Sequence, residues 1–197
     1  MTELPLVLAI TGASGAPYAV RLLEMLVAAE QPTWLIVSDH GFRLLDTESG
    51  IGSLEALRDR IGATAWDRSV RRFDDRDRGA LPASGSVPTR GMVICPCSMG
   101  TVAAIAAGTS RSLVERAADV VLKERRMLIV VPRETPYSDI HLENMLRLTR
   151  AGAIVMPASP GFYHRPRRIE ELVDFVVGRI LDHVGVKHSM PRWSDEP

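Results

Sequence analysis

Five short apolar runs divide the chain. They cover residues 6–10, 34–37, 92–95, 128–131 and 153–156, and each is continuous rather than alternating. A run of this length and composition is typical of a strand that is buried on both faces of a parallel sheet. The stretches between the runs contain apolar residues at helical spacing. This alternation predicts a single-domain, Rossmann-like α/β fold with three layers around a parallel, doubly wound sheet.

The apolar pattern is most regular near the C-terminus. Over residues 169–184 apolar positions recur after three and then one residue, which makes one broad apolar stripe along a helix. Gly185 follows directly and is expected to end that helix. We therefore predict one domain over residues 1–185 and a C-terminal tail over residues 186–197. The polar stretch 69–91 is predicted to be a loop, because no second domain's worth of sequence flanks it.

Composition excludes several classes of protein. Of the 197 residues, 46% are hydrophobic and 24% are charged, and Lys plus Arg equal Asp plus Glu at 24 each. A neutral chain of this kind gives no electrostatic reason to expect binding to nucleic acid or to anionic membranes. No apolar run approaches the ~20 residues that cross a bilayer, and residues 1–5 lack the basic start of a signal peptide. We therefore expect a cytoplasmic protein without a membrane segment.

The two cysteines, Cys95 and Cys97, are one residue apart. This short span disfavours a disulfide between them. Without a nearby His or further Cys, the pair also has poor spacing for a metal site. We expect reduced, buried thiols and no bound metal.

The residues that follow each predicted strand are candidates for function, because doubly wound sheets bind ligands beyond the carboxyl ends of their strands. Gly12–Gly15 follow the first strand, where small residues let a ligand approach the backbone, although Ser14 could instead cap the next helix. Ser38 follows the second strand; taken alone, it and Glu48 each fit a helix cap or a solvated side chain. Ser98–Thr101 follow the third strand and either cap a core helix or offer hydroxyls to a ligand.

Two pairs of charged residues extend this set. Arg133 and Glu134 follow the fourth strand between prolines, and a charged pair in the ligand crevice favours function over a plain turn. Arg116 and Lys123 are seven positions apart and therefore share one face of a helix. Two cations on one face either bind a phosphate or form a solvated surface. Lysine is rare in this chain, since 22 of the 24 basic residues are arginine.

Aromatic residues follow the fifth strand. Phe162 and Tyr163 lie in a Pro- and Gly-rich loop, which suggests a lid or a stacking surface, and Arg179 takes a polar position on the final helix. Together with the hydroxyls, small residues and Arg–Glu pair at the other strand ends, they suit a phosphorylated, planar cofactor. No Ser-His-Asp spacing and no cluster of metal ligands stands out.

Seven segments point to one family when they are taken in order. They are residues 11–16, 95–101, 115–124, 132–136, 140–145, 160–163 and 173–179. With them the chain resembles, over nearly its whole length, the UbiX-type flavin prenyltransferases, formerly called aromatic-acid decarboxylase subunits. The resemblance implies a Rossmann-like flavin-binding domain, commonly in a homododecamer built from trimers. It also implies an enzyme that needs no metal and joins the dimethylallyl group of dimethylallyl monophosphate to N5 and C6 of reduced FMN. The product, prenylated FMN, would serve a UbiD-type decarboxylase.

The resemblance further implies roles for individual residues of this chain. Those expected to hold FMN are Gly12, Ala13, Ser14, Ser38, Ser98, Met99, Gly100, Thr101 and Arg133. Those expected to hold dimethylallyl phosphate are Arg116, Lys123, Tyr163, Arg179 and Trp193, with Trp193 closing over the site from a neighbouring subunit. The expected catalytic residues are Ser14 and Glu134, which manage protons or orient the phosphate, Glu48 at the step on flavin C6, and Lys123 at the leaving phosphate.

Three alternatives stay open at this point. A non-catalytic FMN carrier would use the same binding residues, although Lys123, Glu134 and Glu48 have no obvious use in it. A flavin-dependent cysteine decarboxylase of related fold typically has a Pro-x-Met-Asn run, where this chain has Pro132-Arg133-Glu134. A direct aromatic-acid decarboxylase would release carbon dioxide by itself. One departure from the family pattern is Ser112, where many members carry Asn, and it concerns the adjoining loop and the choice of allylic substrate.

Overall fold

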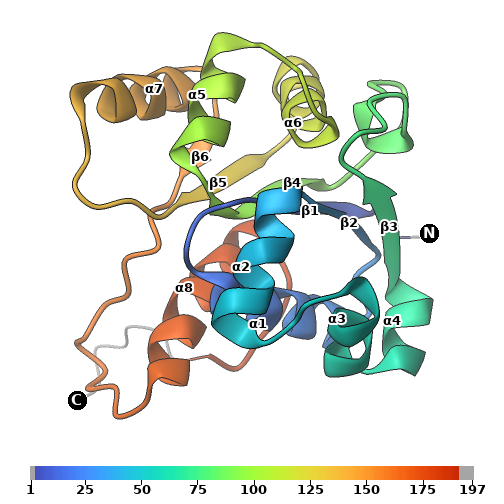
Figure 1. The fold of residues 1–197 in the computed structure, drawn as a ribbon, viewed down its shortest axis with the longest axis vertical. Helices are drawn as coiled ribbons and strands as arrows, with labels where there is room; N and C mark the ends of the chain where they lie inside the picture. The colour runs from blue at the N-terminus through green and yellow to red at the C-terminus, as the bar shows by residue number, and fades with distance from the viewer. Residues whose placement is uncertain (1–2, 191–197) are drawn as a thin grey trace.

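A parallel sheet forms the middle layer of the fold (Figure 1). The computed structural model describes residues 3–190, and within them the sheet has six strands in the order β3-β2-β1-β4-β5-β6. The strands are β1 (Leu6–Ile10), β2 (Thr33–Val37), β3 (Val70–Asp74), β4 (Gly91–Cys97), β5 (Leu128–Pro132) and β6 (Ile154–Val155). The strand order reverses between β1 and β4, and ligands of such folds bind in the crevice at this reversal. The predicted fold class is confirmed.

Helices cover both faces of the sheet (Figure 1). They are α1 (Ala16–Ala28), α2 (Asp39–Ser49), α3 (Leu54–Ile61), α4 (Ala63–Ser69), α5 (Met99–Ala107), α6 (Leu113–Lys123), α7 (Asp139–Arg150) and α8 (Ile169–Val184), with a short 3-10 turn, η1 (Leu81–Ala83). Alternate side chains of β1 enter two separate cores. Leu6 and Leu8 pack with α1 and α8, whereas Val7 and Ala9 pack with α5 and α6. Burial on both faces explains why the strand is continuously apolar.

The edge strand β3 corrects the prediction of a loop over residues 69–91. Val70–Asp74 pair in parallel with β2, and within β3 only Phe73 is buried. Arg71 and Arg72 are exposed, and the Arg71 guanidinium lies 5.0 Å from the centre of the Phe73 ring. Charged residues on an edge strand discourage pairing with other chains. The same charges hide the strand from a search for apolar runs.

The last helix follows the predicted stripe closely. α8 ends at Val184, and Gly185 takes the left-handed conformation at φ +71°. Residues 186–190 then fold back onto the helix, because Val186 and Met190 are both buried. A Cβ added at Gly178 would lie 3.2 Å from Met190 Cβ, so glycine makes room for this return.

The two cysteines are buried in β4, as predicted. Burial disfavours the thiolate and raises the pKa of Cys95 to about 12. Burial and the neighbouring Cys95 raise the pKa of Cys97 still further. Within residues 3–190 there is no helix long and apolar enough to span a membrane. The described part of the chain also contains no group of three or more His, Cys, Asp or Glu residues that could hold a metal ion.

Candidate functional site

The loops after β1 and β4 are joined by a buried threonine. The Thr11 hydroxyl donates to the Pro96 carbonyl at 3.0 Å and accepts from the Ser98 amide at 2.9 Å. Thr11 is only 3% exposed, so both hydrogen bonds form where water cannot replace them. This contact brings the segment 12–14 and the start of α5 side by side at the carboxyl edge of the sheet, as the predicted FMN site requires.

The end of β2 lies against the same edge. The Ser38 amide donates to the Ile10 carbonyl at 3.0 Å, and the Ser38 hydroxyl accepts from the Gly41 amide at 3.0 Å, which caps α2. A Cβ at Gly12 would lie 2.5 Å from His40 Cβ. Glycine at this position therefore lets α2 start directly over the β1 loop.

The start of α5 provides hydrogen-bond donors for an anion. Ser98 caps the helix, with its hydroxyl 3.2 Å from the Thr101 amide and 3.0 Å from the Thr101 hydroxyl. The amides of the first helical turn have no partner within a helix, and a helix N-terminus attracts negative charge. A Cβ at Gly100 would meet only the Ser98 hydroxyl, at 3.8 Å. The start of α5 is therefore open on the side of Gly100.

Glu48 caps α1 from a different helix. Its Oε2 atom accepts from the Gly15 and Ala16 amides, at 2.8 Å in each case. The hypothesis that Ser14 caps α1 is wrong, because the capping position falls on Gly15 at φ +120°. Ser14 instead contributes a side-chain hydrogen bond to Glu48. The contact joins the end of α2 to the β1 loop. Of the two predicted roles for Glu48, helix cap and solvated side chain, the structure bears out the cap.

The surroundings of Glu48 favour its ionised form. Partial burial opposes ionisation, but the hydrogen bonds from Ser14, Gly15 and Ala16 and the charge of Arg133 together outweigh it and lower the pKa of Glu48. Glu48 therefore presents a carboxylate at neutral pH, held at the start of a helix.

The loop after β5 carries the predicted Arg–Glu pair to this cluster. Arg133 Nε donates to the Ser14 carbonyl at 3.3 Å across the switch point of the sheet. Glu134 is half-buried in the same loop, and its Oε1 accepts from the Thr135 amide at 3.0 Å. The structure thus gathers the ends of β1, β2, β4 and β5, together with Glu48, at one edge of the sheet, and we refer to this cluster as the crevice.

Tyr163 and Arg179 lie along one side of α8. The Tyr163 ring meets the Phe175 ring edge to face, with centres 5.7 Å apart. Arg179 is four residues after Phe175, so both project from the same face of the helix. Arg179 is also the eleventh residue of α8, roughly 15 Å from the start of the helix, and the helix ends near Arg90 at the amino edge of the sheet. Within one chain Arg179 therefore lies away from the crevice. Arg179 Nη1 donates to Asp182 Oδ2 at 2.9 Å.

Lys123 does not join the crevice within one chain, whereas Arg116 is in the first turn of the same helix, toward the carboxyl edge. The start of α6 is fixed at the carboxyl edge, because the Leu113 amide donates to the carbonyl of Asp75, just after β3. The helix then runs antiparallel to the strands for 11 residues, which is roughly 16 Å. Lys123 therefore lies at the amino edge, where its Nζ is 2.8 Å from the position of a Cβ at Gly85.

Two further sequence predictions, at Ser112 and Trp193, have separate outcomes. Ser112 caps α6 by accepting from the Glu115 amide at 3.4 Å, a task that Asn also performs well. The departure from the family pattern therefore leaves the start of α6 capped. Trp193 lies outside the described residues. The sequence did not single out Asp182 or His188, whose hydrogen bond of 3.1 Å joins α8 to the segment after it.

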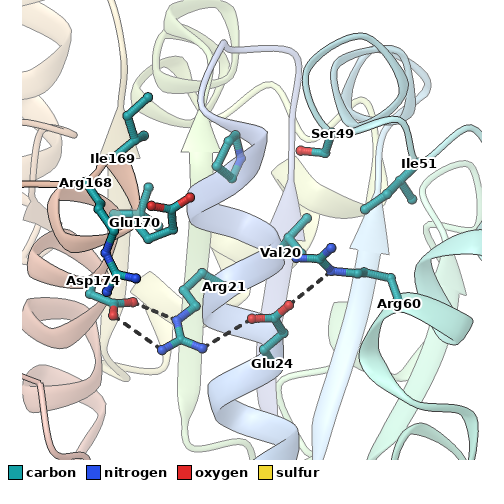
Figure 2. A pocket seen from close by; sticks show the side chains of 12 residues that line it. Val20, Arg21, Glu24, Ser49, Ile51, Arg60, Arg168, Ile169, Glu170 and Asp174 are labelled. Carbon is teal, nitrogen blue, oxygen red and sulfur yellow. Dashed lines mark hydrogen bonds and ion pairs between the residues drawn. The ribbon is translucent and has the colours of Figure 1, made fainter.

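A cavity of about 590 Å³ lies between α1, α3 and α8 (Figure 2). Arg21 pairs with Asp174 at 2.6 Å and with Glu24 at 3.3 Å, and Arg60 also pairs with Glu24 at 3.3 Å. These charges therefore largely satisfy one another. Among residues 3–190, no residue predicted for the site lines this cavity, but its lining residues Pro17 and Ser49 directly follow Ala16 and Glu48, so the cavity adjoins the Glu48 side of the crevice.

Comparison with known proteins decides the family. The model of the flavoprotein family matches residues 1–181. The flavin prenyltransferase UbiX of Pseudomonas aeruginosa is 49% identical over 197 aligned residues, which cover 96% of this chain and 93% of that protein. This chain belongs to the UbiX family of flavoproteins. The family inferred from the seven segments is thereby confirmed.

Solved structures of UbiX proteins share the whole fold. The crystal structure of AnUbiX in complex with FMN and dimethylallyl pyrophosphate has a TM-score of 0.86 and 37% identity, and the match covers 98% of this chain and 100% of that one. The dodecameric FMN-dependent UbiX-like decarboxylase from Escherichia coli O157:H7 has a TM-score of 0.87 and 41% identity, with 96% and 98% covered. The match therefore includes the loops at the carboxyl edge as well as the sheet.

Proposed function

We propose that this chain is a flavin prenyltransferase, which joins the dimethylallyl group of dimethylallyl phosphate to reduced FMN. The observation that carries the proposal is the crevice, in which Ser14, Glu48, Arg133 and the capped start of α5 meet in a chain of the UbiX family. FMN supplies the reacting N5 and C6 atoms and is itself a substrate of this reaction. The residues around the crevice bind the two substrates, orient them and exchange protons with them.

The donors in the crevice fit a phosphorylated flavin. The start of α5 and the hydroxyls of Ser98 and Thr101 provide the neutral donors and the local dipole that suit a phosphate. Arg133 adds a charged planar donor, which can pair with a phosphate or lie against a flat ring. The residues we assign to FMN are Gly12, Ala13, Ser14, Ser38, Ser98, Met99, Gly100, Thr101 and Arg133.

Glu48 is the base of the proposed reaction. The bond to C6 of the flavin forms after the C=C bond of the N5-bound group has taken up a proton, and C6 then loses its own, so no proton is gained or lost overall. An ionised carboxylate at this edge can accept the proton from C6. The lowered pKa of Glu48 keeps it ionised at neutral pH. We assign Ser14, which hydrogen-bonds Glu48, and Glu134 to the remaining proton movements and to orientation of the leaving phosphate.

We assign Tyr163 and Arg179 to the phosphate of the allylic substrate, with Arg179 reaching it from a neighbouring copy of the chain. As the C–O bond breaks, the phosphate leaves with the bonding electron pair, and cations beside it stabilise the charge that develops. Arg179 is more than half exposed on α8 and can offer two parallel N–H groups to a phosphate. The neighbouring rings of Tyr163 and Phe175 provide faces that favour an allylic cation.

We assign Arg116 and Lys123 to the same phosphate in a neighbouring copy of the chain. Within one chain Lys123 lies at the opposite edge of the sheet, so only another copy can bring it to the crevice. Large apolar side chains are well placed for assembly, since Ile140, Leu142 and Leu146 of α7 are 67%, 53% and 48% exposed. We propose a homo-oligomer, and a dodecamer as in the E. coli relative, to which Trp193 contributes from the tail.

The product would be prenylated FMN, and its recipient a UbiD-type decarboxylase in the cytoplasm. The test supplies an apo decarboxylase of that type with the filtrate of a reaction that contains this protein, reduced FMN and dimethylallyl phosphate. Activation only when all three components were present supports the proposal. Activation without the allylic phosphate would favour the FMN carrier. Release of carbon dioxide by this protein alone would favour a direct decarboxylase.

A further inference from the structure

Arg179 is the exposed end of a hydrogen-bonded chain that starts in the C-terminal segment. Arg179 Nη1 donates to Asp182 Oδ2 at 2.9 Å, and the other carboxylate oxygen, Oδ1, is 3.1 Å from His188 Nε2. The Met190 amide donates to His188 Nδ1 at 3.1 Å. Since Nδ1 accepts a hydrogen bond, the ring proton is on Nε2 and points at Asp182.

The side chains become steadily more exposed from His188 through Asp182 to Arg179. The side chain of His188 is 1% exposed, that of Asp182 is 22% exposed and that of Arg179 is 54% exposed. An exposed Arg–Asp pair one helical turn apart is only weakly ordered, because the small electrostatic gain barely offsets the rotamer freedom that both side chains lose. A buried imidazole on the second oxygen of the carboxylate removes part of that freedom. The guanidinium is thereby held before any ligand arrives.

The packing of the C-terminal segment supports the same arrangement. Gly178 lies inside α8, where glycine costs about 1 kcal/mol relative to alanine. A Cβ there would lie 3.3 Å from His188 Cε1 and 3.3 Å from Met190 Sδ. The absence of a side chain therefore lets His188 settle against the helix, one turn before Asp182.

We propose that Asp182 and His188 are positioning residues that hold the Arg179 guanidinium ready for the phosphate of the allylic substrate. The proposal rests on the proposed function, because that function makes Arg179 a phosphate ligand. Arg179 has five N–H donors, and its contact with Asp182 leaves other donors for two phosphate oxygens. The C-terminal segment therefore affects affinity for the allylic substrate through His188, separately from any contact by Trp193.

Three variants separate positioning from simple packing. Asp182→Asn removes the charge that holds the guanidinium while keeping the size of the side chain. His188→Phe keeps a buried ring but removes the donor to Asp182, whereas His188→Gln keeps an N–H donor. The matched control is Glu171→Gln, which removes a comparable contact on α8, between Glu171 and Arg168 at 3.3 Å, two turns away from Arg179.

The measurements are the Kd for dimethylallyl phosphate on the oligomer loaded with oxidised FMN, the KM and kcat of prenyl transfer, and the Kd for FMN. We expect Asp182→Asn and His188→Phe to raise the Kd and KM for the allylic phosphate about fivefold or more. The Kd for FMN and the kcat should stay within about twofold. His188→Gln should recover most of the affinity, and Glu171→Gln should match the unsubstituted protein.

Unchanged affinity for the allylic phosphate in both Asp182→Asn and His188→Phe would overturn the inference. So would an equal loss of FMN affinity, since that result would mean general damage to the fold. Failure of the proposed function gives a different result: the unsubstituted protein would then bind no dimethylallyl phosphate, or bind it without transferring the prenyl group.

Discussion

Replacing Glu48 should destabilise the protein through helix α1 as well as slow the reaction. Glu48→Ala leaves the Gly15 and Ala16 amides, each now 2.8 Å from the carboxylate, without their acceptor. Losing a helix cap costs about 1 kcal/mol, within a range of about 0.5–2. A carboxylate at a helix start adds about 0.3–1 kcal/mol, and we take the lower part of that range because Glu48 is only partly buried.

The expected loss for Glu48→Ala is therefore about 1–2 kcal/mol in the free energy of unfolding. In a chain of this size that lowers Tm by roughly 2–8 °C. Glu48→Gln keeps an oxygen acceptor but not the charge, so we expect about half this loss. The assay is urea unfolding of the flavin-free protein at one fixed concentration, because oligomer stability depends on concentration. Glu143→Ala, which removes an exposed carboxylate from α7, is the control.

The pH dependence gives this prediction a second readout. The pKa of Glu48 lies below its ordinary value of 4.5 in the folded protein. The carboxylate therefore contributes its full stability above about pH 4.5–5 and loses it as the pH falls through the lower folded value. The gap between the unsubstituted protein and Glu48→Ala should stay constant from pH 8 to pH 5 and narrow below pH 4.5. A gap of zero at pH 7, or one that stays constant down to pH 3.5, would refute the capping role.

Three other predictions follow from the crevice and the core. Arg133→Ala should weaken FMN binding about tenfold, as flavin fluorescence titration would report; unchanged affinity would remove Arg133 from the site. Lys123→Ala and Glu134→Gln should each slow prenyl transfer severely, and Glu134→Gln should still bind FMN. When the two variant proteins are dissociated, mixed and reassembled, part of the activity should return. Some sites of the mixed oligomer then combine a native Lys123 from one copy with a native Glu134 from another. No recovery in the mixture would mean that Lys123 acts within its own chain or not at all. Cys95, with its pKa raised to about 12, and Cys97 should not react with a thiol reagent at pH 8 until the protein unfolds; fast labelling of the native protein would contradict their burial.

The buried centre of the fold was predictable from the sequence because burial on both faces leaves a continuous apolar run. The edge strand β3 was not, since only Phe73 of Val70–Asp74 is buried and the exposed arginines resemble those of a loop. The C-terminal helix was predictable to its last residue, because an apolar stripe and a following Gly185 mark both its face and its end.

The candidate site was predictable where function attaches to strand ends, as with Ser98 and Arg133. The partners of these residues were not, because they come from distant parts of the chain. Glu48 meets Gly15 from 33 positions away, and no spacing rule connects them. Lys123 shows the opposite limit: helical spacing correctly placed it on one face with Arg116, but only the topology reveals that this face reaches the far edge of the sheet.

Mass spectrometry of the extracted flavin tests prenyl transfer most directly. The purified protein is incubated without oxygen with reduced FMN and dimethylallyl monophosphate. The flavin is then released and its molecular mass is measured. A flavin prenyltransferase yields FMN heavier by one C5H8 unit, and Lys123→Ala yields far less of it in the same time. Recovery of unmodified FMN from a protein that demonstrably binds both compounds would contradict the proposed function.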